Sequence, residues 1–297
     1  PLECTIFNPQ SSALKDIDEV FNIDVESNLL ADLSVYADGD LIQNQTNSTF
    51  LSFPFSFQSD GNHELILMAQ QNGILASDTI QIMVNPNVLS IDPPESNLGA
   101  NYTDETTILF KLYAPEKNHV YLLGDFNDWE LSSAFHMNRS IDETTWWLEV
   151  SGLVPEQTYA YQYYIDGEIK IADPLSELIL DPNNDDDIPE STFPNLHPYP
   201  QGVATGFVSL VTPGTNEYNW TYDDFQKPEN KDLIIYEILV RDFTHDRNYQ
   251  VLIDTLDYIE NLGINAIELM PPGEFENNES WGYNPSFLMA LDKYYGT

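Results

Sequence analysis

Residues 233–240 read LIIYEILV, a near-continuous run of apolar side chains. A run of this kind is typical of a strand buried on both faces of a parallel sheet. Beyond it, apolar residues recur at helical spacing, at Tyr249, Leu252, Leu256 and Ile259. The sequence therefore predicts a buried strand followed by a helix, the opening of an α/β architecture.

The helix carries its own start and stop signals. Asn248 is a candidate N-cap, and Gly263 follows the last apolar residue of the pattern. Residues 264–270 read INAIELM and predict a second strand, which two prolines close. A strand–helix–strand unit normally makes a right-handed crossover to a parallel neighbour. Because one such unit cannot cover its own sheet edges, residues 231–297 are expected to open a larger α/β domain.

Four short segments of this region occur in a characteristic order and spacing. They are residues 235–243 (IYEILVRDF), 263–271 (GINAIELMP), 281–285 (WGYNP) and 292–297 (DKYYGT). Together they resemble the start of the catalytic barrel of glycoside hydrolase family 13, the α-amylase family. The resemblance implies a (β/α)₈ barrel, and such a barrel needs about 250 residues. Residues 231–297 would then be its first, incomplete part.

The resemblance also implies a chemistry. The family cleaves or transfers α-glucosidic bonds with retention, using an Asp nucleophile, a Glu acid/base and a second Asp, with the reacting carboxyl groups about 5–5.5 Å apart. In the family these groups follow later strands, which would lie beyond Thr297. Glu237 and Glu268 fall on the two expected strands and are interpreted as barrel-lining or structural. We therefore expect residues 1–297 alone to be inactive.

The loop after the second strand holds the candidate substrate-binding residues. Tyr283 follows the C-terminal end of that strand, the face on which such barrels place their chemistry. The resemblance implies that Tyr283 is a stacking platform for the sugar at the cleavage point; the alternative is packing within the loop against Trp281. Asn284 either hydrogen-bonds substrate or shapes the loop. Trp281, Tyr283 and Asn284 are thus the predicted substrate-binding set.

Towards the N-terminus, residues 175–230 are rich in proline and aromatic residues and show little periodicity. A free linker would usually be rich in Gly and Ser or in charge, so the segment is expected to be extended and docked on its neighbours. Residues 185–187 read DDD. They lack the spaced ligands and the glycine of an EF-hand loop, which favours a solvated acidic turn over a calcium site.

Residues 99–174 alternate between apolar and polar side chains, as strands of a sandwich do. The alternating positions are Ile108, Phe110 and Leu112; Val120 and Leu122; Trp146, Leu148 and Val150; and Tyr159, Tyr161, Tyr163 and Ile165. Residues 120–129 (VYLLGDFNDW), 161–167 (YQYYIDG) and 173–174 (DP) resemble carbohydrate-binding module family 48, a frequent companion of the barrel. The segment is therefore expected to be an immunoglobulin-like sandwich of that family.

Trp129 is the candidate carbohydrate contact of this module. In sugar-binding members of the family the matching Trp stacks on glucose, and a basic residue and a further Trp lie near the Asp-Gly turn. Here that neighbourhood holds Gln162, Glu168 and Ile169. This departure favours a structural role for Trp129, with sugar contact as the alternative.

Residues 1–86 predict short strands between turns. Residues 65–69 and 79–84 flank Asn72-Gly73, a strong hairpin signal, and the length suits an immunoglobulin-like sandwich. A proline-containing stretch separates this block from the next. The predicted fold class is thus two all-β immunoglobulin-like sandwiches followed by the start of an α/β TIM barrel.

Charge and composition exclude several classes of function. The chain has 49 acidic and 10 basic residues, a net charge of −39, which disfavours binding to nucleic acid and to anionic membranes. No apolar run reaches the roughly 18 residues of a membrane span. With Cys4 alone, an internal disulfide or a cysteine metal cluster is excluded, and the five His show no metal-ligand spacing. We predict no metal in this chain. The sequence does not decide whether a complete enzyme binds calcium, nor what the oligomeric state is.

The sequence thus predicts the N-terminal part of an α-amylase-type glycosidase that acts on starch, glycogen or maltodextrins. Its expected location is extracellular, periplasmic or on the cell surface, although no signal peptide is visible. The alternatives are a non-catalytic α-glucan-binding protein and a surface sandwich protein. The strand–helix–strand unit argues against the first, and the WGYNP loop argues against the second.

Overall fold

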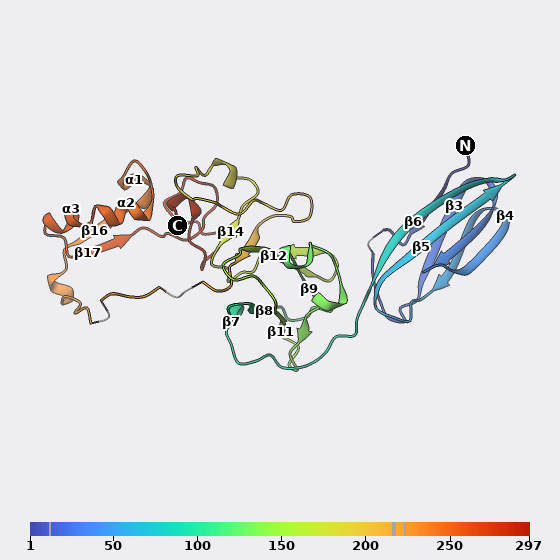
Figure 1. The fold of residues 1–297 in the computed structure, drawn as a ribbon, viewed down its shortest axis with the longest axis horizontal. Coiled ribbons are helices and arrows are strands. Elements are labelled where there is room, and N and C mark those ends of the chain that lie inside the picture. The colour runs from blue at the N-terminus through green and yellow to red at the C-terminus, as the bar shows by residue number, and fades with distance from the viewer. Residues whose placement is uncertain (12, 216–217, 223) are drawn as a thin grey trace.

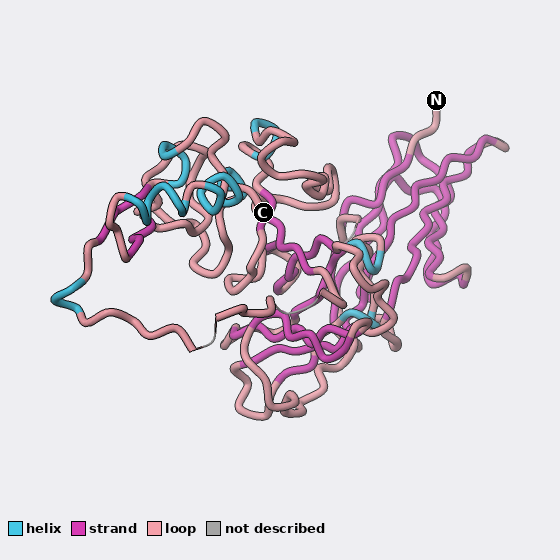
Figure 2. The backbone as a smooth tube through the Cα atoms, turned by 60° about the vertical axis from the view of Figure 1, so that its left-hand side comes forward, coloured by secondary structure: helices cyan, strands magenta, loops and turns pink. Residues whose placement is uncertain are grey.

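The computed structural model describes residues 1–297 except residues 12, 216–217 and 223. Strands dominate the first two parts of the chain, and the α-helices gather in the last (Figures 1 and 2). Short 3₁₀ turns lie at Asp125–Asn127, Ser133–Phe135, Asp185–Asp187, Asn230–Asp232 and Lys293–Tyr295. Over the described residues, every helix is too short or too polar to cross a membrane.

The first part is built on one long strand that pairs with several others. Its strands are β1 (Cys4–Asn8), β2 (Ala13–Asp16), β3 (Phe21–Ala37), β4 (Asp40–Phe55), β5 (Gly61–Gln71) and β6 (Ile74–Asn85). The first half of β3 pairs with β1 and the second half with β5, while β4 follows β3 along most of its length. Alternate β3 residues, such as Ile23, Val25, Leu33 and Val35, are fully buried in the core. This burial follows from the period of two along a strand.

The predicted hairpin in this part is confirmed. Strands β5 and β6 pair antiparallel up to Gln71 and Ile74. Asn72 and Gly73 have φ values of 48° and 80°, the left-handed conformations that a type I′ turn requires.

The segment between the first two parts, residues 86–98, is docked along the second. The amide of Ile91 donates to the Arg139 carbonyl at 2.8 Å, and the Arg139 amide donates to the Leu89 carbonyl at 2.9 Å. The indole of Trp147 donates to the Ile91 carbonyl at 2.8 Å. The segment is therefore held by backbone pairing at a sheet edge.

Polar contacts also join the first part to the second. Asp16 accepts a hydrogen bond from Asn85 at 2.8 Å, and its Oδ1 lies 3.0 Å from His119 Nε2. The other ring nitrogen of His119 lies 3.0 Å from His136, and the Tyr121 hydroxyl donates to Asn85 at 2.8 Å. Because Tyr121 is fully buried, this contact seals the junction from water.

The second part is a sandwich of two sheets. One contains β7 (Gly99–Asp104), β8 (Thr107–Tyr113), β11 (Thr145–Val150) and β10 (Asn138–Arg139). The other contains β9 (Val120–Gly124), β12 (Tyr159–Ile165), β13 (Ile169–Ile171), β15 (Val208–Val211) and β14 (Ile179–Leu180). Side chains from both sheets share one core, which includes Phe110, Leu122, Trp146 and Tyr161. The strands predicted from alternation between residues 99 and 174 are confirmed.

The structure differs from the expected extended linker at residues 175–230. This segment returns to the sandwich as β14 and β15, and β15 pairs with β12 from Tyr159 to Tyr161. Strands of two and four residues are too short to show periodicity, so no pattern in the residues indicated them. Further on, Tyr218, Trp220, Tyr222 and Phe225 are 72–82% exposed, so their rings are not docked on the described neighbours.

The last part is a β-α-β unit. Strands β16 (Ile235–Ile238) and β17 (Ala266–Leu269) pair in parallel, and α1 (Val240–Phe243), α2 (Tyr249–Asp254) and α3 (Leu256–Asn261) lie between them in the chain. The Asn248 side chain caps α2 by accepting from the Val251 amide at 2.9 Å, and Gly263 follows α3 with φ 84°. The predicted strands, cap and stop are confirmed.

The prediction that residues 233–240 are buried on both faces of a sheet is wrong for much of the strand. Ile234, Ile235 and Tyr236 are 38–54% exposed. The cause is the size of the sheet, since among the described residues it consists of β16 and β17. The buried cluster of this part lies at the C-terminal end of β16, where Ile238 and Val240 pack against Leu252, Ile259, Phe275 and Tyr295.

Candidate functional site

The loop that follows β17, residues 270–297, folds onto itself. Isolated bridges pair Gly273 with Leu291 and Phe275 with Pro285. The amide of Glu274 donates to the Ala290 carbonyl at 2.8 Å. Phe275 is 1% exposed and belongs to the core under the sheet. The loop is therefore anchored at both of its flanks, around the predicted Trp281–Tyr283–Asn284 set.

A tight turn holds the centre of this loop. Gly282 has φ 86°, and a Cβ built on it would lie 1.9 Å from the Pro271 carbonyl oxygen. The Ser280 hydroxyl accepts from the Gly282 amide at 3.0 Å and donates to the Asn284 side chain. Arg241 donates to the Ser280 carbonyl at 3.2 Å. The Asn284 side chain thus contacts its own loop, and its contact with substrate stays a prediction.

The turn exposes the aromatic rings on either side of Gly282. Trp281 is 63% exposed and Tyr283 is 65% exposed, whereas Gly282 between them is buried. A ring exposed to this degree is not packed into its own loop. Aromatic rings in such positions present flat apolar faces to ligands.

Charged side chains are buried beneath this loop. Lys293 is 2% exposed, and its Nζ lies 2.6 Å from Glu274 Oε1 and 3.2 Å from Asp185 Oδ1. Burial raises the pKa of the Glu274 carboxyl to about 7, with Lys293 opposing that rise. Burial likewise raises the pKa of Asp292 to about 6. Sequence reasoning missed this cluster, because its members are far apart in the chain.

The expectation of a solvated acidic turn at residues 185–187 is therefore wrong for Asp185. Its side chain is 11% exposed and faces Lys293, while Asp186 and Asp187 are exposed. Burial raises the pKa of Asp185 above its ordinary value, although Lys293 lowers it. In the part of the chain that the structure describes, no group of three or more His, Cys, Asp or Glu side chains is arranged to hold a metal ion.

Trp129 lies in a different environment. It is half-buried against the cluster of Ala160, Leu180, Ala204, Val208 and Leu210. Its indole donates to Asp125 at 2.8 Å, and the other Asp125 oxygen accepts from the Ala160 amide at 2.7 Å. These contacts support the structural interpretation of Trp129.

Three acidic residues lie outside the buried cluster: Asp125 in the module, and Glu237 and Glu268 on the two strands of the last part. His197 lies 3.2 Å from Asp125. Burial alone would raise the pKa of the Asp125 carboxyl, but its hydrogen bonds with His197, Ala160 and Trp129 lower that pKa below its ordinary value. Glu237 and Glu268 lie opposite each other in the β16–β17 register and are exposed.

Gln162 occupies a position where sugar-binding modules were expected to carry a basic residue. It is fully buried, and its side-chain amide donates to the carbonyls of Thr205 and Phe207, both at 2.6 Å. Its hydrogen-bonding groups are thus committed to holding the segment that leads into β15. This position is structural in the present chain.

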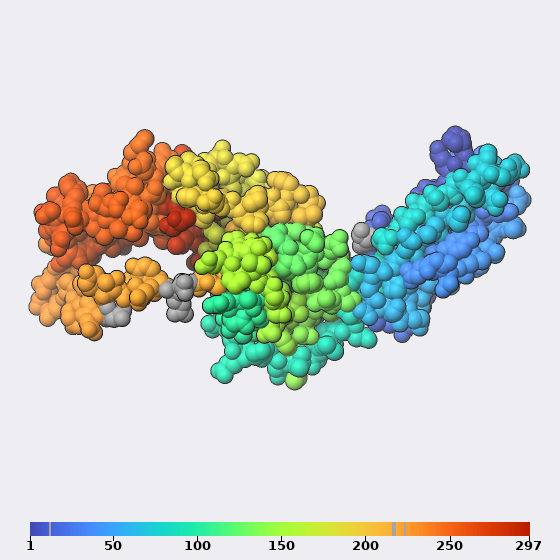
Figure 3. All heavy atoms as spheres, in the orientation of Figure 1, coloured from blue at the N-terminus to red at the C-terminus, as the bar shows by residue number. Residues whose placement is uncertain are grey.

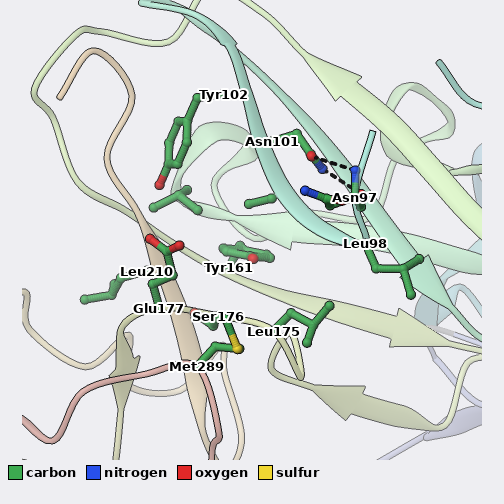
Figure 4. Close-up of a pocket in the computed structure, with 12 residues that line it drawn as sticks. Asn97, Leu98, Asn101, Tyr102, Tyr161, Leu175, Ser176, Glu177, Leu210 and Met289 are labelled. Carbon is green, nitrogen blue, oxygen red and sulfur yellow. Dashed lines mark hydrogen bonds between the residues drawn. The ribbon is translucent and has the colours of Figure 1, made fainter. Parts of the chain in front are cut away.

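A cavity of about 440 Å³ lies beside β7 and β15, near the buried Tyr161 (Figure 4). The Tyr102 ring and the Glu177 carboxylate lie close together on one side of it, and Met289 of the last loop reaches its edge. The Asn101 amide at its rim donates to the carbonyls of Asn97 and Gly99. The residues of this cavity come from five separate segments, so no local sequence pattern could have revealed it.

Comparison with known proteins shows what parts of the chain are similar to. Residues 97–184 match the family model described as carbohydrate-binding module 48 (isoamylase N-terminal domain). The chain is 32% identical over 118 residues to a malto-oligosyltrehalose trehalohydrolase of Saccharolobus solfataricus, covering 40% of this chain and 19% of that protein. It is 31% identical over 178 residues to the chloroplastic isoamylase 1 of Arabidopsis thaliana, covering 56% and 19%.

A 1,4-α-glucan branching enzyme of Fusobacterium nucleatum is 25% identical over 205 residues, covering 67% of this chain and 31% of that enzyme. The chain thus spans between a fifth and a third of the length of these relatives.

Solved structures share the fold. A Group B Streptococcus pullulanase in complex with maltotetraose matches with a TM-score of 0.50 and 19% identity, over 96% of this chain and 40% of that one. A type I pullulanase of Bacillus subtilis in complex with maltose matches with a TM-score of 0.50 and 17% identity, over 96% and 42%. Residues 97–184 of this mostly β, multidomain chain are a carbohydrate-binding module 48 domain, and its homologues are enzymes of glycoside hydrolase family 13, of which it spans only a part.

Proposed function

We propose that this chain is the N-terminal region of an α-glucan hydrolase that cleaves starch, glycogen or maltodextrins with retention. The observation that carries this proposal is the β16–β17 unit followed by the loop that exposes Trp281 and Tyr283. The parallel pairing and the open sheet edges suit the first two strands of a (β/α)₈ barrel. In such a barrel the loop after β17 lies over the catalytic face.

Within this proposal Tyr283 stacks on the sugar at the cleavage point. The Gly282 turn fixes the backbone on one side of the ring, and Pro285 restricts Asn284 on the other. A ring held in place before the substrate arrives costs little ordering when the substrate binds. Trp281 and Asn284 complete the binding loop, and Trp129 serves the module's own structure.

The rest of the proposal concerns surroundings and partners. The partner is a neutral α-glucan, which a surface of net charge −39 does not repel. The proposed location is outside the cytoplasm, in the periplasm, in the medium or at the cell surface, where a polysaccharide would be met. Cell fractionation with an antibody against residues 1–86 tests the location.

The function itself is tested by the stereochemistry of the product. The full-length protein is incubated with maltodextrin, and the anomer formed first is followed by ¹H NMR. The proposal predicts the α-anomer, because retaining enzymes pass through a covalent glycosyl intermediate. Formation of the β-anomer would contradict the retaining mechanism.

A second candidate is a non-catalytic α-glucan-binding protein, favoured by the match of residues 97–184 to a carbohydrate-binding module. The same sample separates the two functions. Binding to insoluble starch without any release of reducing ends by the full-length protein would support this candidate and reject the hydrolase.

A further inference from the structure

The buried ions beneath the last loop join two segments that are far apart in the chain. Lys293 and Glu274 belong to the loop after β17, whereas Asp185 belongs to the turn that follows β14 of the sandwich. Figure 3 shows the yellow segment, which follows the module in the chain, beside the dark red C-terminal end. Lys293 therefore lies at the junction between the module and the loop.

A second contact supports the same junction. The Asn278 side chain donates to the Asn184 carbonyl at 2.7 Å. On the other side of Lys293, the second oxygen of Asp185 accepts from the Asp181 amide at 2.8 Å. The turn that carries Asp185 is thus fixed to the sandwich side and touches the loop at two places.

Glu274 links this junction to the aromatic turn. Its carbonyl accepts from the Ser286 amide at 2.7 Å, just after the residues that present Trp281 and Tyr283. Its side chain ends on Lys293, and the adjacent Asp292 accepts from the Phe275 and Tyr294 amides. A shift of the Lys293 ammonium would therefore move both flanks of the turn.

The energetics of buried ion pairs indicate that the Lys293 contacts fix how the two segments are arranged. A buried ion pair often adds no stability compared with apolar residues of the same volume, because both ions lose their hydration. Removing one partner is costly, since it leaves an unpaired buried charge. Among the described residues, Glu274 Oε2 has no hydrogen-bond partner, so the ions do not satisfy one another completely.

We propose that Lys293 is a positioning residue that couples the carbohydrate-binding module to the substrate loop, because it holds Glu274 and Asp185 together and thereby fixes the placement of Tyr283. This inference rests on the proposed function, since it takes Tyr283 to contact the sugar. It assigns Asp185 the corresponding role on the module's side of the junction.

The test is a double-mutant cycle in the full-length protein, with maltodextrin as substrate. Lys293→Met keeps the length of the side chain and removes its charge, and is expected to lower kcat/KM about tenfold or more. Combined with Tyr283→Ala, it should add little further loss, because residues that act through one another are not additive. Lys231→Met is the matched control, since that lysine is exposed and pairs only with Glu229 among the described residues.

The outcomes distinguish a failure of the proposed role of Tyr283 from a failure of the positioning role of Lys293. If Tyr283→Ala alone has no effect on kcat/KM, the proposed function of that residue fails. If Tyr283→Ala has its effect but Lys293→Met leaves kcat/KM unchanged, or the two losses simply multiply, the positioning role is wrong. Should Lys293→Met not fold, Asp185→Asn replaces it in the cycle, with a smaller loss and the same non-additivity expected. Lys293→Arg should recover part of the activity, because it restores the charge.

Discussion

Trp129 and Tyr283 are both aromatic residues in tight turns of a chain related to α-glucan enzymes, yet their side chains differ in burial and in contacts. The Trp129 indole is hydrogen-bonded to Asp125 and packs against a buried cluster. Tyr283 is 65% exposed beside a glycine that leaves no room for a side chain. Of these two rings the fold leaves that of Tyr283 the more exposed, and an exposed ring face is what stacking on a ligand requires.

The largest expected effect concerns the stability of the module. Trp129→Ala should lower the free energy of unfolding by about 3–5 kcal/mol, because it removes a packed ring and leaves Asp125 without its indole donor. Thermal or chemical denaturation of residues 1–297 measures this. An unchanged melting temperature combined with lost binding to insoluble starch would make Trp129 a sugar contact and remove the contrast with Tyr283.

Tyr283→Ala should produce the opposite pattern. We expect an unchanged melting temperature and a loss of about 2–4 kcal/mol in transition-state stabilisation, measured as kcat/KM of the full-length protein on maltodextrin. Tyr283→Phe, which keeps the ring, is the control and should cost much less. Near-normal turnover by a folded Tyr283→Ala protein would return Tyr283 to a merely structural role.

Gly282→Ala tests the turn that exposes the ring. Its φ is 86°, and the new Cβ would meet the Pro271 carbonyl, so we expect a loss of stability of about 1–3 kcal/mol together with reduced activity. Gly263→Ala is a matched control, because Gly263 has φ 84° but nothing within 4 Å of the added Cβ. If both variants behave alike, the close approach to Pro271 has no role in holding the loop.

The two junctions of the module should respond to pH in opposite directions. Glu274 has its pKa raised to about 7 by burial, so the folded protein holds more protons than the unfolded chain between pH 4.5 and 7. Stability from this group is present at low pH and is lost as the pH rises through 7. In Glu274→Gln the slope of the melting temperature between about pH 6 and 7 should disappear, whereas Asp292, whose pKa burial raises to about 6, keeps a slope below that range. An unchanged slope between pH 6 and 7 would show that other groups cause it.

His136 at the junction with the first sandwich gives the reverse slope. Burial lowers its pKa to about 4, with His119 adding to the effect and Asp16 and Asp60 opposing it. The unfolded chain therefore holds more protons between pH 6.5 and 4, and stability is lost as the pH falls through that window. A His136→Phe variant whose melting temperature kept the same acid slope would contradict this assignment.

The sequence predicted those parts of the molecule whose cause is local. Alternation along β8 and β12 and the Asn72-Gly73 hairpin turn depend on neighbours in the chain, and so does the Asn248 cap. The two short strands β14 and β15 have no such pattern. The exposure of β16 could not be predicted either, because burial of a strand depends on how many strands lie beside it.

The candidate site likewise contains features that the sequence predicted and features that it did not. The Gly282 turn and the aromatic residues beside it could be found from the motif. The Asp185–Lys293 pair could not, since it forms only when two distant segments meet. A charged triplet such as residues 185–187 looks like a solvated turn until a partner for one of its members is known.

The central claim is that α-glucan meets this chain at Tyr283 and not at Trp129. A crystal structure of the full-length protein with maltotetraose tests it most directly. The account predicts a glucose ring stacked on Tyr283 and no sugar at the half-buried face of Trp129. A glucose ring stacked on Trp129, with the Tyr283 ring free of sugar, would contradict it.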